Sequence, residues 1–223
     1  MKYFLTILFL FSFTVNAKTI RVGVVDSGMP NFDTNLKVCP NGVYDLTHTD
    51  VYDKIGHSTN ILGIISNGLK DIDYCAVVIK VYDENSADTT FITHLIAYLY
   101  LYYLHVDVVN YSSVGAEDEG KAEEVLIKGM ISRGVKFVAA AGNHNVDLDK
   151  NCSAFPACIP GVISVGNLKS DGARHSSSNY GKIVKVWQIG VNVCANNICY
   201  TGTSQATAKQ TIEEVKKLIK ERR

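Results

Sequence analysis

Short runs of β-branched apolar residues alternate with longer helical segments along the chain, and this alternation restricts the fold more than any other feature. The runs lie at 20–25, 76–81, 106–110, 135–141, 162–165 and 183–187. Apolar runs of this length, separated by helices, are typical of strands that are buried on both faces of a parallel sheet. We therefore expect an α/β fold, with a three-layer, mostly parallel sheet flanked by helices.

Helices are expected between these runs. Apolar residues recur at helical spacing over 58–66, 119–133 and 204–221. The segment 89–104 is apolar almost throughout, and we interpret it as a buried helix. A membrane span is the alternative for it, although spanning a bilayer takes roughly 20 residues. There is no internal repeat and no linker, so 18–223 is expected to be one domain.

Composition excludes several classes of protein. The chain has 223 residues, a formal net charge of zero and no basic run apart from its last few residues. A dedicated nucleic-acid-binding protein would have a basic patch, so no nucleic-acid partner is expected. Hydrophobic residues make up 47% of the chain, which is too much for a disordered protein.

The N-terminal segment 1–17 has the pattern of a secretory signal peptide. Lys2 is followed by an apolar run that ends in the small-residue cleavage pattern Val15-Asn16-Ala17. The alternative is a retained membrane anchor, but the run is short for that. We expect a secreted protein, extracellular or periplasmic, with no membrane association after cleavage.

Six cysteines agree with an oxidising compartment. Six cysteines allow fifteen connectivities. The close pairs Cys152–Cys158 and Cys194–Cys199 would close short loops, which leaves Cys39–Cys75 for a longer one. A zinc site is the competing interpretation, but neither a Cys-x-x-Cys motif nor a neighbouring histidine at ligand spacing supports it.

Asp26, His57 and Ser204 occur in the chain order Asp, His, Ser. Serine becomes a good nucleophile when a histidine removes its proton, and a carboxylate must orient that histidine. Each residue also has a structural interpretation: Asp26 as a turn residue, His57 as a structural histidine and Ser204 as part of a helix cap. Asn143, which follows Gly142, could likewise serve only in a turn. The combination in this order favours catalysis over these separate explanations.

Four segments around these residues resemble the signature blocks of the subtilase family, the subtilisin-like serine proteases. They are 24–28 (VVDSG), 56–59 (GHST), 140–143 (AAGN) and 202–208 (GTSQATA). The similarity runs from about Val22 to about Lys216 and implies a subtilisin-like fold and peptide-bond hydrolysis. It implies that Asp26 orients His57, that His57 is general base and then acid, and that Ser204 is the nucleophile. The Asn143 amide would donate into the oxyanion hole.

The resemblance also implies where a protein or peptide substrate binds. The substrate would add as a strand to the edge Ser112, Ser113, Val114 and Gly115. That edge carries one residue more than the family spacing. The walls of the primary pocket would be Ala140, Ala141 and Gly142, with Ala154 at its floor. The Phe155–Pro156 bond matches a position where the family has a cis peptide, and we predict cis there.

Departures from the family pattern bear on partners and cofactors. The first strand is expected to follow the signal peptide directly, without room for an inhibitory and folding propeptide, so a separately encoded inhibitor or folding partner is a candidate partner. The family's calcium loop is expected to be missing, and no cofactor or metal is predicted. Asn60 replaces the second histidine of the His57 block, and Ala208 replaces a family proline.

Two other classes of function remain as alternatives. A non-catalytic subtilase-like module that binds peptides or partners is the first, although such a module would gain nothing from a complete triad. A nucleotide-binding α/β domain is the second, but the segment 22–28 (VGVVDSG) lacks the G-x-G-x-x-G spacing.

Overall fold

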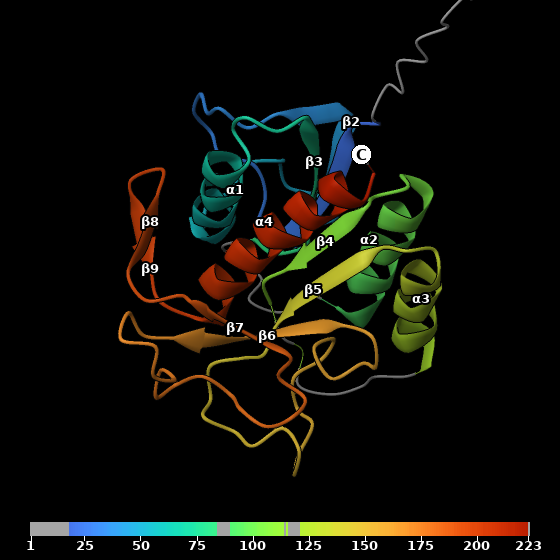
Figure 1. Ribbon diagram of the computed structural model, residues 1–223. Helices are drawn as coiled ribbons and strands as arrows, with labels where there is room; N and C mark the ends of the chain where they lie inside the picture. Colours follow the sequence, from blue (N-terminus) through green and yellow to red (C-terminus); the bar gives the residue numbers. More distant parts are fainter. Residues whose placement is uncertain (1–17, 84–89, 114, 116–120, 223) are drawn as a thin grey trace, which may run out of the picture.

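The computed structural model describes residues 18–83, 90–113, 115 and 121–222. The expected signal peptide 1–17 lies outside these residues. Seven strands form one sheet in the order β2-β3-β1-β4-β5-β6-β7, and each neighbouring pair is parallel (Figure 1). The strands are β1 (Ile20–Asp26), β2 (Val38–Asp45), β3 (Tyr74–Lys80), β4 (Val108–Tyr111), β5 (Lys136–Ala140), β6 (Ile163–Leu168) and β7 (Val186–Ile189).

Helices cover both faces of this sheet, which confirms the three-layer α/β fold. Helices α1 (His57–Gly68) and α4 (Thr203–Glu221) lie on one face, and α2 (Phe91–Tyr103) and α3 (Lys121–Ser132) lie on the other (Figure 1). Alternate strand residues serve the two faces: Val24 packs in the cluster of α1 and α4, whereas Val25 packs in that of α2 and α3. This alternation follows from the two-residue period of a strand.

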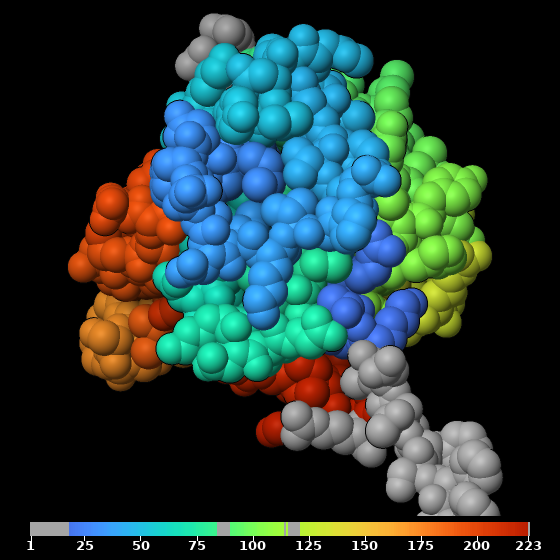
Figure 2. Space-filling model, turned by 90° about the horizontal axis from the view of Figure 1, so that it is seen from above, coloured from blue at the N-terminus to red at the C-terminus, as the bar shows by residue number. Residues whose placement is uncertain are grey.

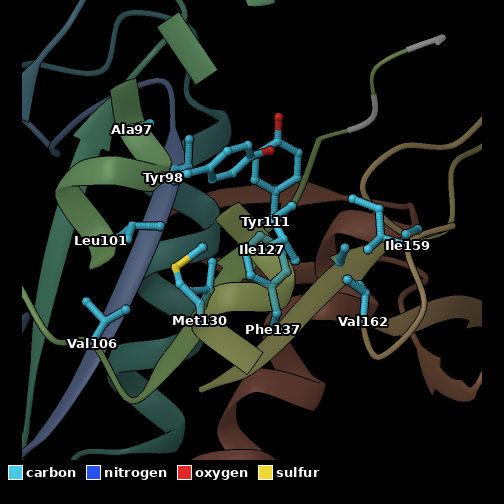
Figure 3. Close-up of a cluster of buried hydrophobic side chains, with 14 of the residues drawn as sticks. Ala97, Tyr98, Leu101, Val106, Tyr111, Ile127, Met130, Phe137, Ile159 and Val162 are labelled. Carbon is cyan, nitrogen blue, oxygen red and sulfur yellow. The ribbon is translucent and has the colours of Figure 1, made fainter. Parts of the chain in front are cut away.

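An aromatic group fills the core under α2 and α3. Figure 3 shows the rings of Tyr98 and Tyr111 side by side, with Phe137 below them. The ring centroids of Tyr98 and Tyr111 are 5.8 Å apart, and Tyr98 meets Phe137 edge-on at 5.9 Å. Such pairs stabilise a core by about 0.5–1.5 kcal/mol beyond the area that they bury.

Helix α2 is buried along one face only, so the prediction of a buried helix is half right. Ala97, Tyr98 and Leu101 are buried, while Ile92 and Tyr103 are 65% and 72% exposed. A wholly apolar segment looks the same to a periodicity argument whether one face or both are covered. Of the helices within the described ranges, none is long and apolar enough to cross a membrane.

Two strand features were not expected from the sequence. Strand β2 contains Pro40, Asn41 and Gly42, and its register against β3 shifts between Val38 and Val43. A second, two-stranded sheet is formed by β8 (Val193–Ala195) and β9 (Ile198–Tyr200), which we call the hairpin. Its turn residues, Asn196 and Asn197, have φ of 50° and 62°, as type I′ turns require.

The structure contains three disulfides among the described residues, and they are the pairs that the spacing suggested. Cys39–Cys75 ties β2 to β3, Cys152–Cys158 closes a loop and Cys194–Cys199 closes the hairpin. The Phe155–Pro156 bond is cis, as predicted. In Figure 2 the N-terminal part of the chain, in blue and cyan, lies between the hairpin in orange-red and α2 in green.

Candidate active site

Asp26 and His57 meet at the carboxyl end of the central strand. Asp26 is the last residue of β1, between β3 and β4, where the direction of strand progression reverses. Open α/β sheets bind ligands at such switch points. His57 is the first residue of α1, and its Nδ1 lies 2.8 Å from Oδ1 and 3.0 Å from Oδ2 of Asp26. Because an ionised carboxylate only accepts, Nδ1 carries the proton and Nε2 is left as a base.

Opposing effects set the pKa of His57. Burial by itself lowers it, but the charge and hydrogen bond of Asp26, with a smaller contribution from Asp53, outweigh burial. The pKa is therefore raised above the usual 6.5. Asp26 stabilises the imidazolium form that a general base becomes when it accepts a proton.

A second buried carboxylate, Asp53, supports this pair and was not predicted. It accepts hydrogen bonds from the backbone of Ile55 and Gly56, and from both the N–H and the hydroxyl of Thr59, at 2.6–2.9 Å. The Ser27 hydroxyl lies between Asp53 (2.9 Å) and Asp26 (3.2 Å). Asp53 thus fixes the start of α1, and with it His57. The only signal in the sequence was an acid shortly before a helix, which is a common capping pattern.

The turn before α1 is also fixed by a buried lysine. Lys80, at the end of β3, is 1% exposed, and its ammonium donates to Thr49 Oγ1 and to the backbone oxygens of Asp50 and Tyr52 at 2.8–3.0 Å. The carboxylate of Asp50 lies 3.7 Å away. The loop that leads to His57 is thereby attached to the sheet.

Ser204 lies in the first turn of α4 and is buried, at 9% exposure. Its hydroxyl donates to the backbone oxygen of Ser112 at 2.8 Å, and Ser112 Oγ donates back to the Ser204 carbonyl at 3.2 Å. Among the described hydrogen bonds, none joins Ser204 to His57. Catalytic hydrogen bonds are often incomplete without substrate, so this arrangement is compatible with a resting state.

Asn143 lies against the α4 N-terminus and is exposed. Its Oδ1 accepts the N–H of Thr203 at 3.0 Å, so its Nδ2 is the group left to donate to a substrate. Asn179, which the sequence argument missed, holds this loop: it donates to Ala141 O at 2.7 Å and accepts from the N–H groups of His144 and Val146. Asn179 is far along the chain from these residues, so no local sequence pattern indicated this role.

A cavity of about 300 Å³ opens beside His57. Its lining includes Ser112 and Ser113 of the predicted substrate edge, together with Tyr82, whose hydroxyl is hydrogen-bonded to Ser113. Val114 lies outside the described residues. Gly115 pairs with Phe155 through bonds of 2.8 and 3.2 Å, so both of its backbone groups already have partners.

The predicted primary-pocket residues are buried. Ala140 is 2% exposed, Ala141 0% and Ala154 1%, and Gly142 is also buried. Ala141 and Ala154 pack in the same core cluster as the aromatic group. Within the described part of the chain, no three histidine, cysteine or acidic side chains are grouped so as to hold a metal ion.

The chain is similar in sequence to known proteins. The model of the subtilase family matches residues 17–216. The chain is 29% identical over 199 residues to "Subtilisin-like protease 2" of Trichophyton tonsurans and 30% over 201 residues to that of Trichophyton rubrum. In both cases the match covers 84% of this chain and 45% of the relative. The chain thus spans less than half the length of these curated relatives.

Solved structures show the same fold. A cold-adapted subtilisin-like serine proteinase superposes with a TM-score of 0.74 at 24% identity, covering 89% of this chain and 76% of the other. The protease domain of PatA gives a TM-score of 0.73 at 19% identity, with 89% and 81% covered. With the family match over most of its length, the chain belongs to the subtilase family of serine proteases.

Proposed function

We propose that the chain is a secreted serine endopeptidase in which Asp26, His57 and Ser204 form the triad and Asn143 contributes to the oxyanion hole. The observation that carries the proposal is the contact of His57 Nδ1 with Asp26, at 2.8 and 3.0 Å, at the switch point of the sheet. Acyl transfer requires an imidazole oriented in this way and a serine for it to activate, and Ser204 lies in the first turn of α4.

The mechanism has two steps. Ser204 Oγ turns from the Ser112 carbonyl toward His57 Nε2, loses its proton to it and attacks the peptide carbonyl. Asn143 Nδ2 and the backbone N–H of Ser204 donate to the oxyanion, and the partial positive charge at the α4 N-terminus favours it. His57 then protonates the leaving amine. A water deprotonated by His57 hydrolyses the acyl-enzyme and restores Ser204.

Substrate and location belong to the same proposal. Proteins or peptides are the substrates, bound along Ser112–Ser113 beside the cavity next to His57. Secretion follows from the proposed signal peptide 1–17, with 18–223 as the peptidase domain, and the disulfides suit an oxidising compartment. A separately encoded inhibitor or folding partner remains part of the proposal.

One observation favours the alternative of a non-catalytic binding module. The Ser204 hydroxyl is engaged by Ser112 O and not by His57. A module that binds peptides would retain the edge at Ser112–Ser113 and need no activated serine.

A fluorophosphonate probe distinguishes the two functions. The purified, oxidised protein is incubated with the probe, and any adduct is located by mass spectrometry, with Ser204→Ala as control. Labelling at Ser204 that disappears in the control supports the peptidase. A folded protein, verified by circular dichroism, that stays unlabelled would refute it and leave the binding module.

A further inference from the structure

Three elements meet around the proposed triad, and each brings one group to it. Helix α1 begins with His57, and α4 carries Ser204. The hairpin ends in Tyr200, whose ring centroid is 6.3 Å from that of His57. The relative positions of these three elements therefore decide how the histidine and the serine are aligned.

One buried pair of amide side chains connects the three elements. Gln205, next to the nucleophile, donates from Nε2 to Oδ1 of Asn60 at 3.0 Å. Asn60 in turn donates from Nδ2 to the backbone oxygens of Val193 (3.1 Å) and Ile198 (2.7 Å), one on each strand of the hairpin. Asn60 is 0% exposed and Gln205 is 2% exposed. All hydrogen-bonding groups of the Asn60 side chain are therefore used for this connection.

The hairpin lies against α1, and the Asn60 contact is one of several that hold it there. Each of its strands has three residues, and a two-stranded hairpin is at best marginally stable in isolation. Asn196, at its turn, donates to the backbone oxygen of Thr59 at 2.9 Å. A Cβ added to Gly63 of α1 would lie 2.7 Å from Asn196 Nδ2 and 2.8 Å from Ala195 Cβ, so the hairpin lies directly against α1.

From these contacts we infer that Asn60 and Gln205 are positioning residues for the reaction. Their amide pair holds the His57 helix, the Ser204 helix and the hairpin in one fixed arrangement. This role rests on the proposed peptidase function. Without the pair, α1 and α4 still pack in one apolar cluster, but no hydrogen bond fixes their alignment next to Ser204. A misplacement of about 1 Å in reacting groups can lower a rate about 10²-fold.

The chain provides a matched control on the same helix. Gln210 of α4 is also 2% exposed, and its amide is paired with Glu214 (2.7 Å) and Gln188 (2.8 Å). Gln205→Met and Gln210→Met each remove one buried amide of the same size. Loss of stability is expected from both, because Gln205→Met leaves the buried Asn60 Oδ1 without its donor and Gln210→Met removes the hydrogen bonds to Glu214 and Gln188. Loss of alignment is expected only from Gln205→Met.

The experiment measures the rate of fluorophosphonate labelling at Ser204, kcat and KM for a peptide p-nitroanilide, and the melting temperature. We expect Gln205→Met to lower the labelling rate and kcat about 10- to 100-fold with little change in KM, while Gln210→Met lowers only the melting temperature. If Gln205→Met does not fold, Gln205→Glu keeps the shape and removes the donated hydrogen bond.

Asn60→Asp tests the contact with the hairpin. It keeps an acceptor for Gln205 but turns a carboxylate oxygen toward the carbonyls of Val193 and Ile198. A similar loss of labelling rate is expected. Equal labelling rates in the Gln205 and Gln210 variants would overturn the inference. If the wild-type protein is active in the same experiment, the proposed function stands. An unlabelled wild-type protein would overturn the proposed function, and this role with it.

Discussion

His94 is expected to make the fold sensitive to acid. It lies on α2 beside the aromatic group, with its ring centroid 5.7 Å from that of Tyr82 and 5.8 Å from that of Tyr111. Its Nδ1 is 2.7 Å from the Tyr111 hydroxyl. Burial lowers the pKa of His94 from 6.5 to about 4, because a charged imidazole loses its hydration there.

The sign and size of the effect follow from this pKa. Between pH 6.5 and 4 the unfolded chain binds a proton at His94 that the folded protein does not bind, so stability falls as the pH falls. The loss is about 2 kcal/mol at pH 5 and approaches about 3 kcal/mol below pH 4. For a domain of this size, 2 kcal/mol corresponds to roughly 4–8 °C in melting temperature.

His94→Gln is the variant that isolates this contribution, because glutamine retains a hydrogen-bonding group for Tyr111 and does not titrate. Free energies of unfolding are measured by urea denaturation at pH 7.5 and pH 5 for both proteins. We expect the wild-type protein to lose about 2 kcal/mol more than the variant between the two pH values. Because other titrating groups are common to both proteins, parallel losses would refute the assignment to His94.

Four further changes have defined outcomes. Because the pKa of His57 is raised, kcat/KM should fall on acidification through a pH above 6.5, and a pH–rate profile with a flat acid limb would contradict the base role of His57. Asp26→Asn should lower kcat about 10⁴-fold, read from the same kind of profile. Asn143→Ala should lower kcat about 10²- to 10³-fold with KM little changed, and an unaffected kcat would remove it from the oxyanion hole. Replacing Cys39 and Cys75, 36 residues apart, by serine should reduce the free energy of unfolding by about 4 kcal/mol in urea titrations, whereas a loss below about 1 kcal/mol would show that the reduced chain is already constrained.

The sheet was predictable because its strands are marked locally. Runs such as 20–25 and 76–81 are apolar on both faces, and only a sheet covered on both sides accommodates them. Strand β2 was missed because Pro40, Asn41 and Gly42 carry turn signals inside it. The hairpin was missed although Asn196-Asn197 is a recognisable turn signal, because its flanking strands are only three residues long.

The residues of the site likewise include some that the sequence could predict and some that it could not. The proposed triad and Asn143 occur in distinctive local segments, and the structure brings Asp26 and His57 into contact. Asn179 and the pair Asn60–Gln205 act through partners that are distant in the sequence, so no local pattern points to them. A polar residue that is buried against a remote partner has the same local signature as one that is exposed on a helix.

The ammonium of Lys80 acts on the loop before His57 as a bound cation would. Oxygens from Thr49, Asp50 and Tyr52 surround it, as oxygens surround calcium in a binding loop. This cation is covalently attached to β3, so a chelator cannot remove it and dilution cannot release it. The positive charge that these oxygens surround is therefore part of the chain itself, next to the segment that presents the proposed base.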